Sequence, residues 1–197
     1  MPQARQGAVL LNHPGTKTFY LYGGVLNEPL GGISKLLLFD KNDCRWDMVM
    51  PEYKLTTPQK LKGLMGIHGA FYRGKFHFFF GSQIFNKMTK QKMCVNEILV
   101  YDSTRNEFSM KYPEHVPTRY LPGRKYYASF VLDDTFYFHG GTDANDVVQD
   151  EFVGVNLETY KWHEVNLQEL KPWFPIGACQ CSTNTTTMQS LGKASSE

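Results

Sequence analysis

Residues 136–165 read FYFHGGTDANDVVQDEFVGVNLETYKWHEV. An aromatic-rich run ends in the pair Gly140-Gly141, a polar loop follows, and an apolar run then ends at Asn156, six residues before Trp162. A glycine pair can mark a nucleotide-binding loop, and Trp162-His163 could belong to a ligand site. The choice between a binding motif and a structural motif depends on whether the pattern recurs along the chain.

The pattern occurs three times. Its other copies are FYLYGGVLNEPLGGISKLLLFDKNDCRWDMV at 19–49 and FHFFFGSQIFNKMTKQKMCVNEILVYDSTRNEFSM at 76–110. In each copy a glycine follows the aromatic run, namely Gly23, Gly81 and Gly140. An Asp or Asn ends the second apolar run, namely Asp40, Asp102 and Asn156. A large aromatic follows six residues later, namely Trp46, Phe108 and Trp162. Such constant spacing indicates an internal repeat.

Each unit predicts a four-stranded antiparallel meander, so the sequence predicts an all-β fold. Short aromatic-dense runs before the glycines are typical of strands buried on both faces. Turn formers such as Pro14-Gly15 and Arg73-Gly74 precede these runs and predict hairpins. The Asp or Asn at the next turn can accept hydrogen bonds from its own backbone two residues on. The expected strands are 8–12, 19–22, 35–39, 68–72, 76–80, 97–101, 126–132, 136–139 and 152–155, each unit ending in a strand that carries the large aromatic.

These units resemble the kelch repeat, which forms one blade of a β-propeller. The resemblance covers about residues 6–167 and is strongest in the first and third units. In the second unit Gly81-Ser82 replaces the glycine pair, Phe108 replaces tryptophan, and the basic segment KMTKQK is inserted at 87–92. The resemblance implies blades packed face to face around a central axis, and it implies no particular activity.

The predicted domain is a propeller segment over 1–181, followed by a polar tail that we expect to be disordered at 182–197. Its units are 6–51, 61–113, 122–167 and a partial fourth at 172–181. Because propellers typically close with 4–8 blades, three units leave two apolar faces to be covered. Three explanations stay open: a fragment of a longer protein, a homodimer that pairs three blades with three, or a half-ring capped by a partner.

The glycines and the large aromatics have structural roles on this interpretation. We expect the first glycine of each pair to turn the chain at positive φ, and the second, Gly24 or Gly141, to let neighbouring blades approach. No helix follows the glycines and no Lys-Ser/Thr completes a phosphate loop. We expect Trp46, Phe108 and Trp162 to fill the gap between adjacent blades.

No motif for catalysis or for cofactor binding is recognisable. Cys179 and Cys181 could face one side of a strand, but no second cysteine pair or close histidine pair completes a metal site. The six histidines are dispersed, and no serine, cysteine or carboxylate lies in a known nucleophile or acid/base motif. We therefore predict no metal and no cofactor. Some kelch-type propellers are copper oxidases or sugar-processing enzymes, so an enzyme is the alternative.

Composition argues against nucleic-acid and membrane partners. The 197 residues carry 21 Lys and Arg against 19 Asp and Glu, with both signs scattered along the chain. The apolar runs are far shorter than the roughly 20 residues that span a bilayer. Four cysteines without a scaffold-like spacing and the lack of a signal-peptide pattern favour a reducing compartment, the cytoplasm.

The loops that follow the glycines, 25–32, 83–95 and 142–149, are the candidate binding surface. Loops on a rigid scaffold commonly carry recognition, and we expect these three at one rim of the blades. Their candidate partner-binding residues are Asn27, Glu28, Lys87, Lys90, Lys92, Asp143, Asn145 and Asp146. The sequence therefore predicts a non-catalytic adaptor or scaffold that binds a protein or peptide; the alternative is a propeller enzyme acting on a sugar or other small molecule.

Overall fold

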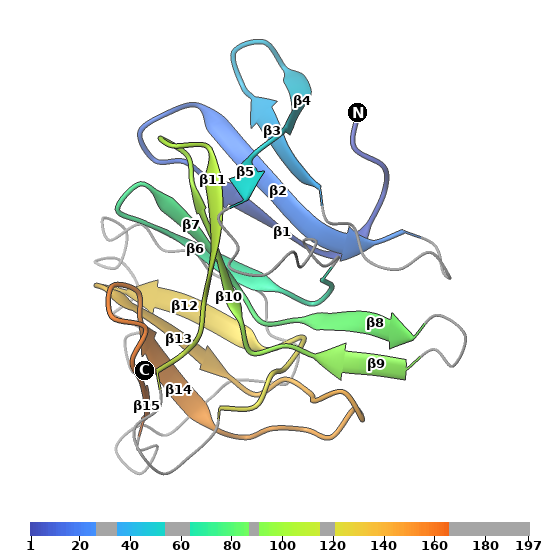
Figure 1. The fold of residues 1–197 in the computed structure, drawn as a ribbon, viewed down its shortest axis with the longest axis vertical. Helices are drawn as coiled ribbons and strands as arrows, with labels where there is room; N and C mark the ends of the chain where they lie inside the picture. The colour runs from blue at the N-terminus through green and yellow to red at the C-terminus, as the bar shows by residue number, and fades with distance from the viewer. Residues whose placement is uncertain (27–34, 54–63, 87–90, 115–120, 166–197) are drawn as a thin grey trace, which may run out of the picture.

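The computed structural model describes residues 1–26, 35–53, 64–86, 91–114 and 121–165, and the regular structure within these ranges is all β (Figure 1). Three four-stranded antiparallel meanders follow one another along the chain, which confirms the predicted fold class of a β-propeller segment. We call these sheets blades 1, 2 and 3. No helix in the described ranges is long and apolar enough to cross a membrane.

The strand order within each blade follows the sequence. Blade 1 consists of β1 (Gln6–Asn12), β2 (Thr18–Val25), β3 (Leu36–Asp40) and β4 (Arg45–Val49). Blade 2 consists of β6 (His68–Tyr72), β7 (Lys75–Phe79), β10 (Ile98–Asp102) and β11 (Glu107–Lys111). Blade 3 consists of β12 (Ala128–Leu132), β13 (Thr135–His139), β14 (Phe152–Asn156) and β15 (Trp162–Glu164).

The chain that leaves the outer strand of one blade pairs with the outer strand of the next. Strand β5 (Glu52–Tyr53) runs parallel to β11, and the Glu52 N–H donates to the Asn106 carbonyl at 2.8 Å. Likewise the Glu114 N–H donates to the Tyr160 carbonyl at 2.8 Å. Asn106 and Tyr160 both end their turns at positive φ, 54° and 59°, and Cys44 holds this place in blade 1 with φ 50°.

Two apolar cores fill the two gaps between the blades. In blade 2 successive side chains alternate between the gaps: Phe76 and Phe78 pack in the core shared with blade 1, whereas Phe79 packs in the core shared with blade 3. On β10, Leu99 and Val100 divide in the same way. All five side chains are at most 5% exposed. A strand with no polar face is stable here because both sides of its sheet are covered.

The large aromatic of the outer strand packs toward the preceding blade. Phe108 is fully buried in the core with blade 1, and Trp162, 5% exposed, belongs to the core with blade 2. Trp46 is half-buried, with its ring 5.0 Å from that of Phe39 in its own blade. The described residues place no sheet before blade 1. Phe108 and Trp162 therefore fill the gap between two blades, as predicted. Trp46 lies at the equivalent position of blade 1, but no described blade covers it.

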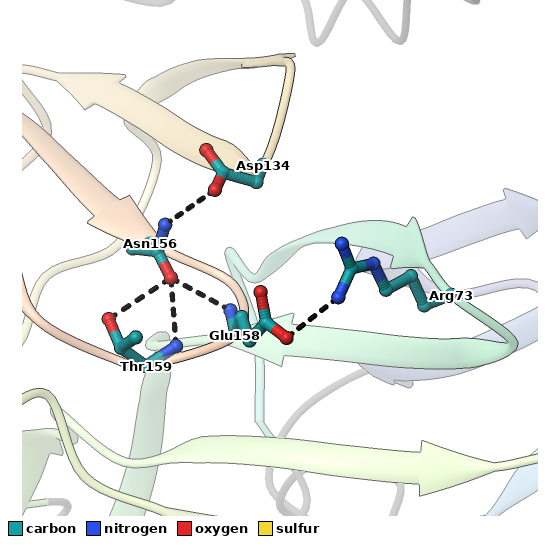
Figure 2. Close-up of polar contacts among 5 residues, drawn as sticks. All are labelled: Arg73, Asp134, Asn156, Glu158 and Thr159. Carbon is teal, nitrogen blue, oxygen red and sulfur yellow. Dashed lines mark hydrogen bonds and ion pairs between the residues drawn. The ribbon is translucent and has the colours of Figure 1, made fainter.

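The predicted turns at the ends of β3, β10 and β14 are confirmed. The Asp40 carboxylate accepts a hydrogen bond from the Asn42 N–H at 2.7 Å, and the Asp102 carboxylate accepts one from the Thr104 N–H at 3.0 Å. Figure 2 shows the third turn, where the Asn156 side-chain oxygen accepts from the backbone N–H groups of the residues two and three positions on, at 3.0 and 2.8 Å.

The strand register shows that the predicted equivalence of Gly81 with Gly23 and Gly140 is wrong. Tyr22, Phe79 and His139 each pair with the first residue of the next antiparallel strand of their blade. The following position is therefore held by Gly23, Phe80 and Gly140. The position after it is held by Gly24, Gly81 and Gly141. All six residues have φ between 50° and 108°. Gly81 thus corresponds to the second glycine of the other units. The sequence alignment placed it one position too early because Phe80 holds the first glycine's position, with a positive φ that glycine usually supplies.

The division of roles between the two glycines also differs from the prediction. A Cβ on Gly23 would lie 2.6 Å from the Ile67 side chain and 2.7 Å from the Leu64 carbonyl, both in the next blade. A Cβ on Gly24 would lie 2.9 Å from the Ala8 Cβ in its own blade. The first glycine therefore allows the blades to approach each other, the second allows packing within a blade, and both satisfy a positive φ.

Alanine at the two first-position glycines should separate these effects. Gly140→Ala should cost about 1–2 kcal/mol for the left-handed backbone, because the nearest atom to its Cβ would be the Gln149 carbonyl at 3.7 Å. Gly23→Ala should cost about 1–3 kcal/mol more, because the added methyl overpacks against Ile67. Urea denaturation measures the free energy of unfolding of both variants. Equal losses would refute the role of Gly23 in the close approach of the blades. Valine at either position should impair folding further.

Truncation of the outer aromatics should depend on the covering blade. We expect Trp162→Ala to lower the free energy of unfolding by about 3–5 kcal/mol, as for a large aromatic deleted from a core. Trp46→Ala, at a half-buried position, is the matched control and should cost clearly less. Denaturant titration followed by circular dichroism gives both values. A near-neutral Trp162→Ala variant would contradict the equivalence of Trp162 and Phe108.

Candidate functional site

The structure describes some of the predicted partner-binding residues. Asn27, Glu28, Lys87 and Lys90 lie outside the described residues. Lys92 lies in β9 (Gln91–Cys94), where the backbone is described. Asp143, Asn145 and Asp146 lie in the loop between β13 and β14. The candidates that the structure describes therefore lie on blades 2 and 3.

Where the sequence predicted a polar loop at 83–95, the structure has a hairpin of β8 (Ser82–Asn86) and β9, with an irregular register between Ile84 and Asn86. The hairpin and the loop at 142–149 project to the same side of the molecule, at the right in Figure 1. Their bases meet where the Cys94 thiol lies 3.9 Å from the Thr142 carbonyl oxygen. Two of the three predicted loop regions thus lie at one rim.

The loop at 142–149 is ordered by its own polar groups. The Asp143 carboxylate accepts hydrogen bonds from the backbone N–H groups of Asn145 and Val147 at 2.8 and 2.9 Å. The Asp143 N–H in turn donates to the Val147 carbonyl at 3.0 Å. Thr142 forms antiparallel bridges with Lys125 on one side and Val148 on the other. Asp143 therefore shapes the loop, which is a structural role that the sequence did not predict.

A buried lysine fixes the outer part of the same loop. Lys125 is 2% exposed, and its ammonium group lies 2.5 Å from the Asp146 carboxylate, which is largely exposed. A buried cation without a partner is costly, so the Asp146 carboxylate stabilises Lys125 where it is. Asp146 itself has φ 63°, a conformation that aspartate adopts more readily than most residues.

A buried arginine supports the entry to the loop. Arg124 is fully buried, donates to the Gly140 carbonyl and contacts the Glu151 carboxylate, both at 3.2 Å. Burial lowers its pKa, but a guanidinium stays charged at neutral pH. Arg5 makes the same contact in blade 1, donating to the Gly23 carbonyl at 3.3 Å. The sequence signal for this contact is an arginine that precedes the first glycine of its unit by 16 residues in blade 3 and by 18 residues in blade 1.

The groups that this rim presents to solvent differ from those predicted. Val147 and Val148 are 56% and 53% exposed, on the returning arm of a loop whose own hydrogen bonds hold it in shape. Asn145 and Asp150 are exposed on either side of them. The residues predicted to bind a partner in this loop are polar and do not include the two valines, although two adjacent valines in an otherwise polar loop are a visible signal in the sequence.

Two side chains that could be chemically reactive, Cys94 and His68, are partly buried. Burial raises the pKa of the Cys94 thiol to about 11, so the thiol is neutral at physiological pH. His68 Nδ1 lies 2.8 Å from the Ser129 hydroxyl oxygen, but Ser129 is 5% exposed and the pair links β6 to β12 between blades 2 and 3. Within the described ranges no group of three or more His, Cys, Asp or Glu side chains could hold a metal ion.

Comparison with known proteins adds the fold. No protein-family model matches the chain, and no curated protein matches it in sequence. Among the solved structures, one described as "Structure of YjhT" has a TM-score of 0.62 and 16% sequence identity. The match covers 82% of this chain and 52% of that chain, so the protein spans about half the length of its structural neighbour. At this identity the likeness shows the all-β fold alone.

Two buried histidines should make stability depend on pH. Burial lowers the pKa of His68 and of His77 from 6.5 to about 4. Between these values the unfolded chain binds more protons than the folded chain, so stability should rise from pH 4 to 6.5 and then level off. Urea midpoints across this range measure the slope. The double variant His68→Gln/His77→Gln should flatten it, and an unchanged slope would contradict the assignment.

Proposed function

We propose that the protein is a non-catalytic interaction module, an adaptor or scaffold, that binds a protein or peptide partner at the rim of blades 2 and 3. The observation that carries this proposal is the exposed pair Val147-Val148 on a loop held by its own hydrogen bonds. Exposed apolar side chains on an ordered loop are more suited to recognition than to stability.

The order of the loop is what makes it suited to binding. A loop already fixed by Asp143 and by the Lys125–Asp146 ion pair loses little conformational entropy when a partner binds. The two valines offer an apolar contact, and the exposed Asn145 and Asp150 offer polar groups around it, as at the core and rim of many interfaces. The complementary partner is a segment with an apolar anchor flanked by a basic or amide side chain.

The chemistry of the cysteines supports a reducing compartment, and we place the module in the cytoplasm. Cys44 is exposed and Cys94 partly buried, and both are free thiols. Free exposed thiols are typical of cytosolic proteins. The alternative function, a kelch-type propeller enzyme acting on a sugar or other small molecule, is distinguished by a metal assay together with a test for turnover of such substrates.

Substitutions at Val147 and Val148 test the binding role. Peptides selected from a random library against the wild-type protein should lose at least about tenfold in affinity for the variant Val147→Asp/Val148→Asp, because aspartate removes the apolar contact. Arg73→Asp is the control. Arg73 lies in the β6–β7 turn at the other end of blade 2, where its guanidinium forms an ion pair with the exposed Glu158 (Figure 2). Equal binding to both variants would refute the proposal.

A further inference from the structure

Successive blades are joined at the inner strands by a repeated backbone hydrogen bond. The Gly66 N–H of blade 2 donates to the Gly7 carbonyl of blade 1 at 2.9 Å. The Tyr126 N–H of blade 3 donates to the Gly66 carbonyl at 3.2 Å. All three residues have positive φ, 70°, 67° and 56°. The series would continue with the Gly7 N–H as donor at one end and the Tyr126 carbonyl as acceptor at the other.

A second repeated junction lies at the outer strands. Blade 2 accepts the incoming chain at the Asn106 carbonyl, and blade 3 accepts it at the Tyr160 carbonyl. The Cys44 carbonyl is the corresponding acceptor in blade 1, on an exposed residue next to β4. Within the described part of the chain, no strand pairs with the outer edge of β4. Blade 1 therefore has a place for the incoming chain of another blade.

The face of blade 1 that points away from blade 2 is built to be covered. Five equivalent positions on this side are at most 5% exposed in blades 2 and 3. In blade 2 they are Phe76, Phe78, Leu99, Tyr101 and Phe108. In blade 1 the same positions are Phe19, Leu21, Leu37, Phe39 and Trp46, and each is only partly buried. Leu10 and Met48 on this face are 53% and 50% exposed. An apolar face of this extent marks an interface.

Blade 3 presents the matching features on its other side. Its positions that face away from blade 2 include Phe130 and Tyr137, whose rings stack at 5.2 Å, and Phe152, 5.8 Å from Tyr137. A Cβ on Gly140 would meet nothing closer than 3.7 Å, whereas the equivalent Gly23 receives the Ile67 side chain of the next blade at 2.6 Å. Blade 3 thus has room where blade 1 already holds its neighbour.

We propose that the partner on the open face of blade 1 is a second copy of this chain, bound through its blade 3. One junction joins a first blade to a last blade, so a two-fold axis along the propeller axis gives two equivalent junctions and closes six blades. Six lies within the 4–8 blades of closed propellers. The proposal is independent of binding at the rim.

The mass in solution is the first test. Light scattering should give twice the chain mass of 22.6 kDa. Trp46→Asp should shift the species to the monomer, because a charge on the apolar face opposes burial. The control Val147→Asp/Val148→Asp, on the rim, should remain dimeric, so failure of rim binding and failure of dimerisation are read separately. A wild-type monomer with a cooperative melt would overturn the proposal.

A designed cross-link tests the geometry even if Trp46→Asp does not fold. The strand registers make Leu10 equivalent to Ser129, and Ala128 equivalent to His68. Because His68 and Ser129 are in contact at 2.8 Å, Ala128 of one copy should lie beside Leu10 of the other. The variant Leu10→Cys/Ala128→Cys should oxidise to a closed dimer with two equivalent bonds, and each single variant should not. A ladder of higher oligomers, or no cross-link, would overturn the proposal.

Discussion

The structure depends on one constraint: a sheet whose central strands carry apolar side chains on both faces is stable only when a neighbour covers each face. Blade 2 meets this condition with Phe78 on one side and Phe79 on the other, both fully buried. The same constraint explains why the two central strands of this blade, β7 and β10, do not alternate between buried and exposed side chains. The burial of each blade is therefore a property of the stack.

Close approach of the blades requires backbone conformations that few residues adopt. Gly23 lies against the next blade where a side chain would collide, and Phe80 adopts the same positive φ with a side chain that turns into the core between blades 2 and 3. At the rim, Asp143 and Asp146 use their carboxylates to hold a loop in place. In each case a local backbone requirement decides which residue types are tolerated, and Val147 and Val148 are the apolar groups of this loop that stay in contact with solvent.

The repeat made much of the fold predictable. The spacing of Asp40, Asp102 and Asn156 from their aromatics located the outer hairpins, because the turn chemistry of these residues is local. The predicted equivalence of Gly81 with Gly23 was wrong, because Phe80 takes the place of the first glycine in blade 2 and adopts the positive φ of that position. The candidate site was harder to predict, since the pairing of Lys125 with Asp146 joins residues 21 positions apart and becomes visible only when the chain folds.

The links between blades have a mechanical consequence. Each blade is attached to the next at two radii, at Gly66 near the axis and at Asn106 on the outer strand, by backbone hydrogen bonds in addition to side-chain packing. A sheet attached at one radius can rotate about that attachment, whereas a sheet attached at two radii cannot rotate without breaking one of the two. The stack therefore resists hinge motion and transmits a displacement at the rim of one blade to its neighbour as a rigid body.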